Sequence, residues 1–121
     1  MTEHAVVFRN VSKRYPHFAL EAVSFELAPG TIQGFIGANG AGKSTTMRIL
    51  MGLIAHDSGT VEVLGHLVLG EAAPAKQRIG YVAEDMRLFP SATLEWHMGF
   101  VARVFGGWDA AYAASLTRRF D

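Results

Sequence analysis

Short segments with alternating apolar and polar residues fill the first half of the chain, which is a pattern typical of β-strands. Residues 5–11 and 22–27 are rich in β-branched and aromatic residues, and the second segment alternates clearly. We expect these two segments to form antiparallel strands. The alternation returns in residues 61–64, after a turn at residues 56–59, and predicts another strand there.

Two further runs are apolar without clear alternation, which favours buried strands of a core sheet. Residues 31–36 follow Pro29-Gly30, and residues 79–82 precede the polar pair Glu84-Asp85. Residues 71–77 are predicted to form a short helix whose first turn contains Pro74.

The remaining segments have helical periodicity. Residues 45–51 predict a helix that ends at Gly52. From Ser91 onward, apolar residues recur every three or four positions and predict a helix that Thr93 or Ser91 caps. Its apolar stripe comprises Leu94, Met98, Val101 and Phe105. A second helix, opening at Trp108-Asp109 after Gly106-Gly107, has the stripe Tyr112, Leu116 and Phe120.

The composition of the chain limits its number of domains, its partners and the kinds of metal site it can form. At 121 residues and 50% hydrophobic composition it can bury one modest core, so we expect one domain or part of one. The 11 basic and 11 acidic residues cancel, which argues against nucleic acid as a partner. Cysteine is absent, so disulfides and thiolate metal sites are excluded. Because no apolar run reaches the roughly 20 residues of a spanning helix, we expect membrane contact through partner proteins alone.

Residues 37–44 read Gly-Ala-Asn-Gly-Ala-Gly-Lys-Ser and match the phosphate-binding pattern G-x-x-x-x-G-K-[ST] at every fixed position. Glycines let successive backbone N–H groups turn toward a triphosphate, and the helix that follows adds its positive end. Lys43 supplies a charge for the phosphates, and Ser44 supplies a hydroxyl ligand for Mg²⁺. The predicted ATP-binding residues of the loop are Gly37, Asn39, Gly40, Ala41, Gly42, Lys43, Ser44 and Thr45.

With these motifs the chain resembles the nucleotide-binding subunit of ATP-binding cassette (ABC) transporters, and in particular those of bacterial ABC-2 or multidrug exporters. The segments that carry the resemblance are residues 37–45, 58–61 with Gly65, and 78–82. It implies an α/β fold: a P-loop NTPase with an N-terminal antiparallel β-subdomain, an incomplete parallel core sheet and the start of a helical subdomain. The core and β-subdomain are expected at about residues 1–85, and the helical subdomain at about residues 86–121.

The resemblance assigns roles to two further residues. Tyr15 matches the aromatic residue that stacks on adenine, although a loop aromatic resting on the sheet is the alternative. Glu84 matches the glutamine that meets Mg²⁺ and the attacking water, and a carboxylate there keeps an oxygen ligand but adds a negative charge. The catalytic residues implied are therefore Lys43 and Glu84, and the metal ligands Ser44 and Glu84. The family's general base is a different carboxylate, located beyond Asp121.

The family's signature segment, its Asp-Glu strand and its switch histidine do not occur in these residues. We therefore expect the N-terminal portion of a longer ATPase, which binds nucleotide here but lacks the hydrolytic half. The implied partners are transmembrane permease subunits and a second ATP-binding subunit, on the cytoplasmic face of the plasma membrane. Three alternatives stay open: a soluble ABC-type ATPase of DNA repair or translation, a nucleotide-binding module without hydrolysis, and a phosphate-loop kinase. The five histidines are given no catalytic or metal role.

Overall fold

A computed structural model describes residues 3–37, 42–69 and 75–120 of the chain. The chain forms two compact units, Met1–Tyr81 and Val82–Asp121. The first unit contains a sheet and a helix, and the second contains two helices. The phosphate loop therefore belongs to the first unit, together with Tyr15.

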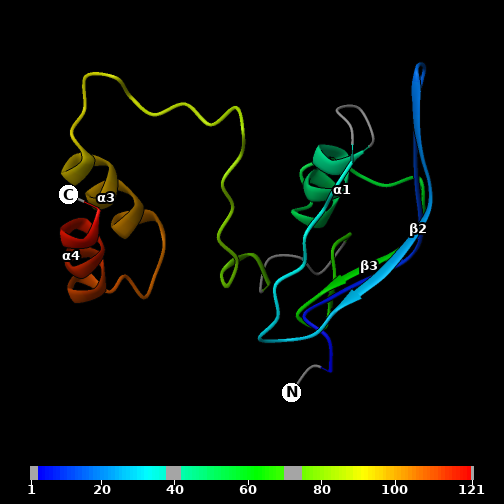
Figure 1. The fold of residues 1–121 in the computed structure, drawn as a ribbon, viewed down its shortest axis with the longest axis horizontal. Helices are drawn as coiled ribbons and strands as arrows, with labels where there is room; N and C mark the ends of the chain where they lie inside the picture. The colour runs from blue at the N-terminus through cyan, green and yellow to red at the C-terminus, as the bar shows by residue number, and fades with distance from the viewer. Residues whose placement is uncertain (1–2, 38–41, 70–74, 121) are drawn as a thin grey trace. The chain divides into compact units, whose positions relative to one another are not determined.

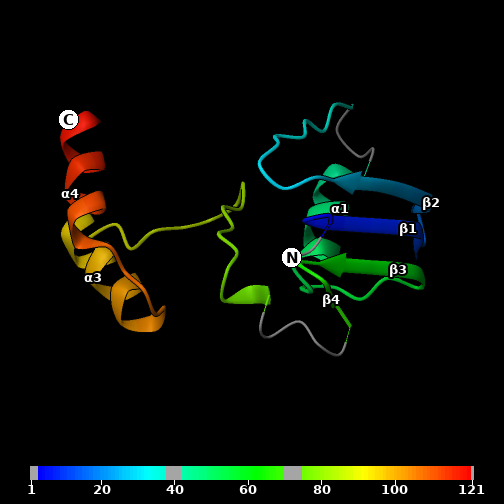
Figure 2. The ribbon, with the colours of Figure 1, turned by 90° about the horizontal axis from the view of Figure 1, so that it is seen from below.

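The sheet of the first unit is antiparallel and has the strand order β2-β1-β3-β4 (Figures 1 and 2). Its strands are β1 (Val6–Tyr15), β2 (Phe18–Leu27), β3 (Ser58–Val63) and β4 (His66–Leu67). This confirms the predicted antiparallel strands. Strands β1 and β2 are longer than predicted because the hairpin continues to the pair Tyr15 and Phe18, with Pro16-His17 as the connecting turn.

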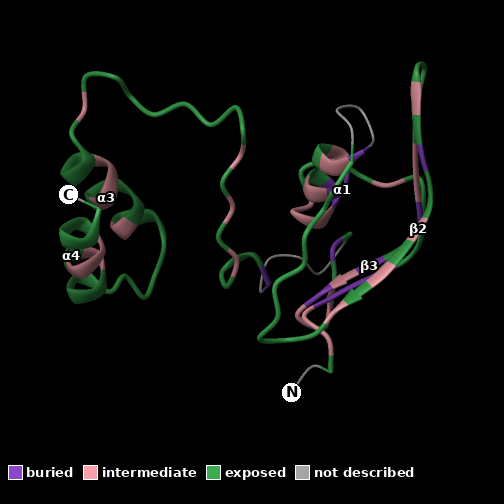
Figure 3. Cartoon of the chain, in the orientation of Figure 1, coloured by how far each residue is buried: buried purple, intermediate pink, exposed green. Residues whose placement is uncertain are grey.

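Helix α1 (Lys43–Leu50) packs on one face of this sheet and closes the core of the first unit (Figure 3). Four side chains are almost completely buried between them: Phe8, Val11, Ile49 and Val61. Each such side chain contributes about 1.5–3 kcal/mol by leaving water. The helix begins two residues before the predicted range 45–51 and ends at Leu50, before Gly52 with its φ of +67°, where the sequence predicted a stop.

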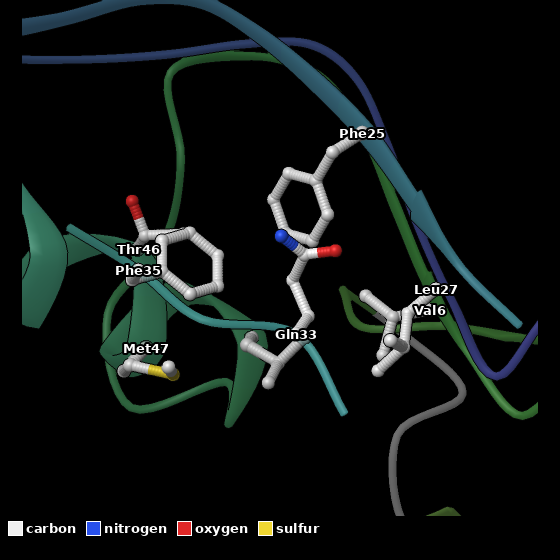
Figure 4. Close-up of a pocket in the computed structure, with 8 residues that line it drawn as sticks. Val6, Phe25, Leu27, Gln33, Phe35, Thr46 and Met47 are labelled. Carbon is white, nitrogen blue, oxygen red and sulfur yellow. The ribbon is translucent and has the colours of Figure 1, made fainter. Parts of the chain in front are cut away.

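The predicted strands at residues 31–36 and 79–82 are not strands in the structure, and both predictions were wrong. Residues 31–36 lie along the first unit without a sheet partner, and Ile32 and Ile36 are fully exposed. Gln33 and Phe35 face inward and line a pocket of about 100 Å³ beside α1 (Figure 4). An isolated strand leaves its backbone N–H and C=O groups unpaired, so a central strand forms only between neighbours.

The second unit contains α3 (Leu94–Val104) and α4 (Ala110–Arg119). Thr93 caps α3, because its hydroxyl accepts a hydrogen bond from the Trp96 N–H at 3.0 Å. Asp109 caps α4 in the same way, with the Tyr112 N–H as donor at 2.8 Å. Both predicted helices are confirmed. Of the helix predicted at residues 71–77, residues 71–74 lie outside the described part of the chain, and Ala75 and Lys76 are helical.

Candidate phosphate-binding site

The candidate site begins at Gly42, where the chain turns into α1. Gly42 has a φ of +100° and is the N-cap residue of the helix. Its carbonyl accepts hydrogen bonds from the Thr46 N–H at 2.9 Å and from the buried Thr46 hydroxyl at 2.8 Å. A Cβ at position 42 would lie 2.8 Å from Leu20 Cδ1. The left-handed backbone conformation therefore favours glycine at this position, while the Leu20 methyl group lies at the end of a flexible side chain and could shift.

Lys43, Ser44 and Thr45 form the first turn of α1. The Lys43 ammonium group donates a hydrogen bond to the carbonyl oxygen of Gly37, so this side chain spans the loop from one end to the other. Ser44 is exposed, and Thr45 is half-buried. The predicted ligands Asn39, Gly40 and Ala41 lie outside the described residues. The first turn of α1 thus carries a lysine and the free N–H groups of a helix N-terminus, and each of these favours an anion.

Tyr15 lies at the end of β1 and is connected to the phosphate loop through Phe18. The Tyr15 and Phe18 rings are stacked with centroids 6.4 Å apart, and Tyr15 is 42% exposed. The Phe18 ring packs against Gly42, since a Cβ there would lie 3.0 Å from Phe18 Cζ. The turn end of the β1-β2 hairpin, through Phe18, thus links the predicted base-stacking residue Tyr15 to the start of α1.

Sequence reasoning missed Phe18 and Asp57 at this site. The turn Pro16-His17 between two aromatic residues could have indicated the hairpin that brings Phe18 next to Tyr15. The Asp57 carboxylate accepts a hydrogen bond from the Arg14 N–H at 2.7 Å, next to Tyr15. The position of Asp57 in the turn before β3 is only weak evidence for a role at the site. Aspartate is common in turns because its side chain forms hydrogen bonds with the nearby backbone.

Glu84 does not belong to the same unit as the phosphate loop. It is an exposed residue of the turn that opens the second unit, where the Met86 N–H donates to the Ala83 carbonyl at 3.2 Å. Its role beside the metal stays a prediction. Among the described residues, His, Asp and Glu form no group of three that could hold a metal ion. In the same ranges, no helix is both long and apolar enough to cross a membrane.

Comparison with known proteins places these features in a family. The model of the ABC transporter family matches residues 20–120. The linearmycin resistance ATP-binding protein LnrL of Bacillus subtilis is 39% identical over 98 residues, which cover 80% of this chain and 32% of that protein. The Nod factor export ATP-binding protein I of Rhizobium etli is 40% identical over 103 residues, covering 84% and 33%. The chain spans about a third of the length of these relatives.

A solved structure described as an ATP binding subunit of an ABC transporter has the same fold. It superposes with a TM-score of 0.76 at 29% identity, over 91% of this chain and 46% of that chain. The matched family model covers most of the chain, including the start of α1 and both helices of the second unit. The chain therefore belongs to the ABC transporter family.

Proposed function

We propose that this chain binds ATP and works as the ATP-binding subunit of an ABC transporter. The observation that carries the proposal is the junction at Gly42 and Lys43, where a left-handed glycine opens a helix and a lysine spans the loop. Such a junction offers backbone N–H groups and one positive charge to the β- and γ-phosphates. Tyr15 stacks on the adenine, and its link through Phe18 to Gly42 supports this assignment.

Magnesium fits the same residues. Mg²⁺ in phosphate-loop sites keeps several waters and takes one or two protein oxygens together with phosphate oxygens, so an acidic cluster is not required. The exposed Ser44 hydroxyl in the first turn of α1 is the protein ligand, and Glu84 is the second candidate. When bound, the ion neutralises charge on the phosphates while the γ-phosphoryl group is transferred to water. Lys43 then holds the phosphates, and Glu84 orients the attacking water.

The full-length protein couples ATP hydrolysis to export by transmembrane partner subunits. The names of its relatives support this direction, since they describe linearmycin resistance, Nod factor export and, in Escherichia coli, a probable multidrug transporter. We place the protein on the cytoplasmic face of the membrane, paired with a second ATP-binding subunit. Because these 121 residues span about a third of LnrL, we propose that they bind ATP without steady turnover.

Calorimetry on the full-length protein tests ATP binding. Lys43→Ala removes one charge-assisted contact worth about 1.5–3 kcal/mol, so we expect the affinity for MgATP to fall roughly ten- to a hundredfold. Lys76→Ala is the matched control, since it removes the same charge from an exposed residue that lies beside Gly52 instead of the loop. Equal affinity of wild type and Lys43→Ala, or no binding heat at all, would refute the proposal.

A further inference from the structure

Asp57 forms hydrogen bonds with the backbone of β1 at the residue before Lys13 and at the residue after it. The Asp57 N–H donates to the Ser12 carbonyl at 2.8 Å, and one carboxylate oxygen accepts from the Arg14 N–H at 2.7 Å. Backbone hydrogen bonds of this kind fix the course of the chain. The last residues of β1 therefore cannot shift relative to the turn that precedes β3 without breaking them.

The second carboxylate oxygen of Asp57 lies 3.5 Å from the Lys13 ammonium nitrogen. That nitrogen also lies over the Tyr15 ring, 5.5 Å from its centroid. Side chains two positions apart lie on the same face of a strand, so Lys13 and Tyr15 are neighbours on β1. Lys13 is thus shared between a carboxylate and an aromatic ring, and it is the less exposed partner of the ion pair, with 20% of its side chain accessible.

Tyr15 needs such support because of its position. It precedes the turn at Pro16-His17 and is 42% exposed, and its ring stacks on Phe18, a residue of the same hairpin. A cation held over an aromatic ring contributes about 0.5–1 kcal/mol at exposed sites. A ring that is already oriented loses less conformational freedom when a base stacks on it.

We propose that Asp57 is a positioning residue for nucleotide binding: through the Arg14 N–H and the Lys13 ammonium group it orients the Tyr15 ring to receive the adenine base. This inference rests on the proposed function, in which Tyr15 stacks on adenine. Asp57 touches neither base nor phosphate in this scheme. Its effect should therefore appear in recognition of the base and not in recognition of the phosphates.

The test compares two ligands of the full-length protein, MgATP and magnesium tripolyphosphate, by calorimetry well below the melting temperature. Stacking of a base is worth about 1–3 kcal/mol, so Tyr15→Leu sets the largest expected loss for ATP. We expect Asp57→Ala to weaken ATP binding by roughly three- to tenfold, within that limit, and to change tripolyphosphate binding by less than about twofold. In the Tyr15→Leu background, Asp57→Ala should cause no further loss.

Two additional variants separate positioning from folding. Asp57→Asn keeps an oxygen acceptor for the Arg14 N–H but loses the charge that holds Lys13, so an intermediate loss for ATP is expected even if Asp57→Ala does not fold. Glu62→Gln is the control, because it removes a carboxylate of β3 that pairs with Arg9. It should leave both affinities unchanged.

The outcomes are distinguishable. If Asp57→Asn and Asp57→Ala weaken ATP and tripolyphosphate equally, or neither, Asp57 serves the fold alone and the inference is overturned while ATP binding stands. If Tyr15→Leu does not change the ratio of the two affinities, adenine does not stack there and the inference is equally lost. If the wild type binds neither ligand, the proposed function falls together with it.

Discussion

Gly59 shows how strongly the packing of two strands can constrain a single residue. It lies in β3 with a φ of +88°, and a Cβ there would lie 2.4 Å from the Asn10 carbonyl oxygen of β1. Because that neighbour is backbone, it cannot move without opening the sheet. We expect Gly59→Ala to lower the free energy of unfolding by more than about 3 kcal/mol, measured by urea denaturation.

Gly30 provides the matched control for that substitution. Its φ is +75°, but a Cβ there would meet nothing within 4 Å. Gly30→Ala therefore carries the conformational cost of a left-handed alanine, about 1–2 kcal/mol, without a collision. Equal destabilisation by both substitutions would show that the close approach of β1 and β3 at Gly59 does not matter.

Asp57 makes stability depend on pH. The Arg14 N–H, which donates to the carboxylate, holds the pKa of Asp57 below its ordinary value of 3.8; desolvation opposes this, and the Lys13 charge adds to it. A carboxyl whose pKa is lower in the folded state stabilises the fold above the unfolded pKa. That stabilisation is lost as the pH falls below 3.8 through the folded pKa.

The Asp57→Asn variant tests this dependence. Its free energy of unfolding should lie below that of the wild type at pH values above about 5, and the two curves should converge as the pH falls below 3.8 through the lowered pKa of folded Asp57. Denaturation at a series of pH values measures the difference. A constant difference across that range would contradict the assignment to the Asp57 charge.

Among helices and strands, sequence patterns correctly predicted those whose packing and pairing partners lie within these 121 residues. The first strands pair with each other and α1 packs on their sheet, so periodicity sufficed to find them. Residues 31–36 have an equally apolar pattern, but a strand also needs neighbours for its backbone groups. The hydrophobic pattern indicates that the side chains of a segment can be buried. It does not indicate whether a neighbouring strand is present to pair with the backbone of that segment.

The same distinction holds for the site. Lys43 and Ser44 could be predicted because the phosphate loop is a local pattern with fixed spacing, and their roles at the site stay predictions. Asp57 was missed because its contacts with Lys13 and Arg14 span more than forty positions of the sequence. Only the register of β1 against β3 brings those residues together.

His97 has a structural role in the loop that precedes α3. Its Nε2 accepts the Phe89 N–H at 3.0 Å, which leaves Nδ1 to donate to the Thr93 carbonyl at 2.7 Å. Replacement of the imidazole removes both hydrogen bonds, and the loss of the acceptor for the Phe89 N–H has a net cost of about 1 kcal/mol. We expect His97→Leu to speed amide exchange at Phe89 roughly fivefold, measured by NMR. Thr117→Val, which removes a hydroxyl bond within α4, is the control and should leave that amide unchanged.

At the scale of the whole molecule, residues 31–36 have two unequal faces. Gln33 and Phe35 point into the pocket beside α1, together with Val6, Phe25 and Met47 (Figure 4). Phe35 also meets Phe25 edge to face, with centroids 5.3 Å apart. Ile32 and Ile36 lie on the opposite face and are fully exposed. Because apolar side chains are stabilised by leaving water, we propose that a layer outside these 121 residues covers the two isoleucines in the full-length protein.

Ile36→Ala tests whether the full-length protein supplies that layer. If further strands and helices cover Ile36, its truncation leaves a core cavity and should cost about 2–5 kcal/mol of unfolding free energy. Leu53→Ala is the control, because Leu53 is 60% exposed in the loop after α1 and a surface truncation costs about 0.5 kcal/mol or less. Urea denaturation of the full-length variants measures both. A cost for Ile36→Ala no larger than the control would mean that this face of residues 31–36 stays in water in the full-length protein as well.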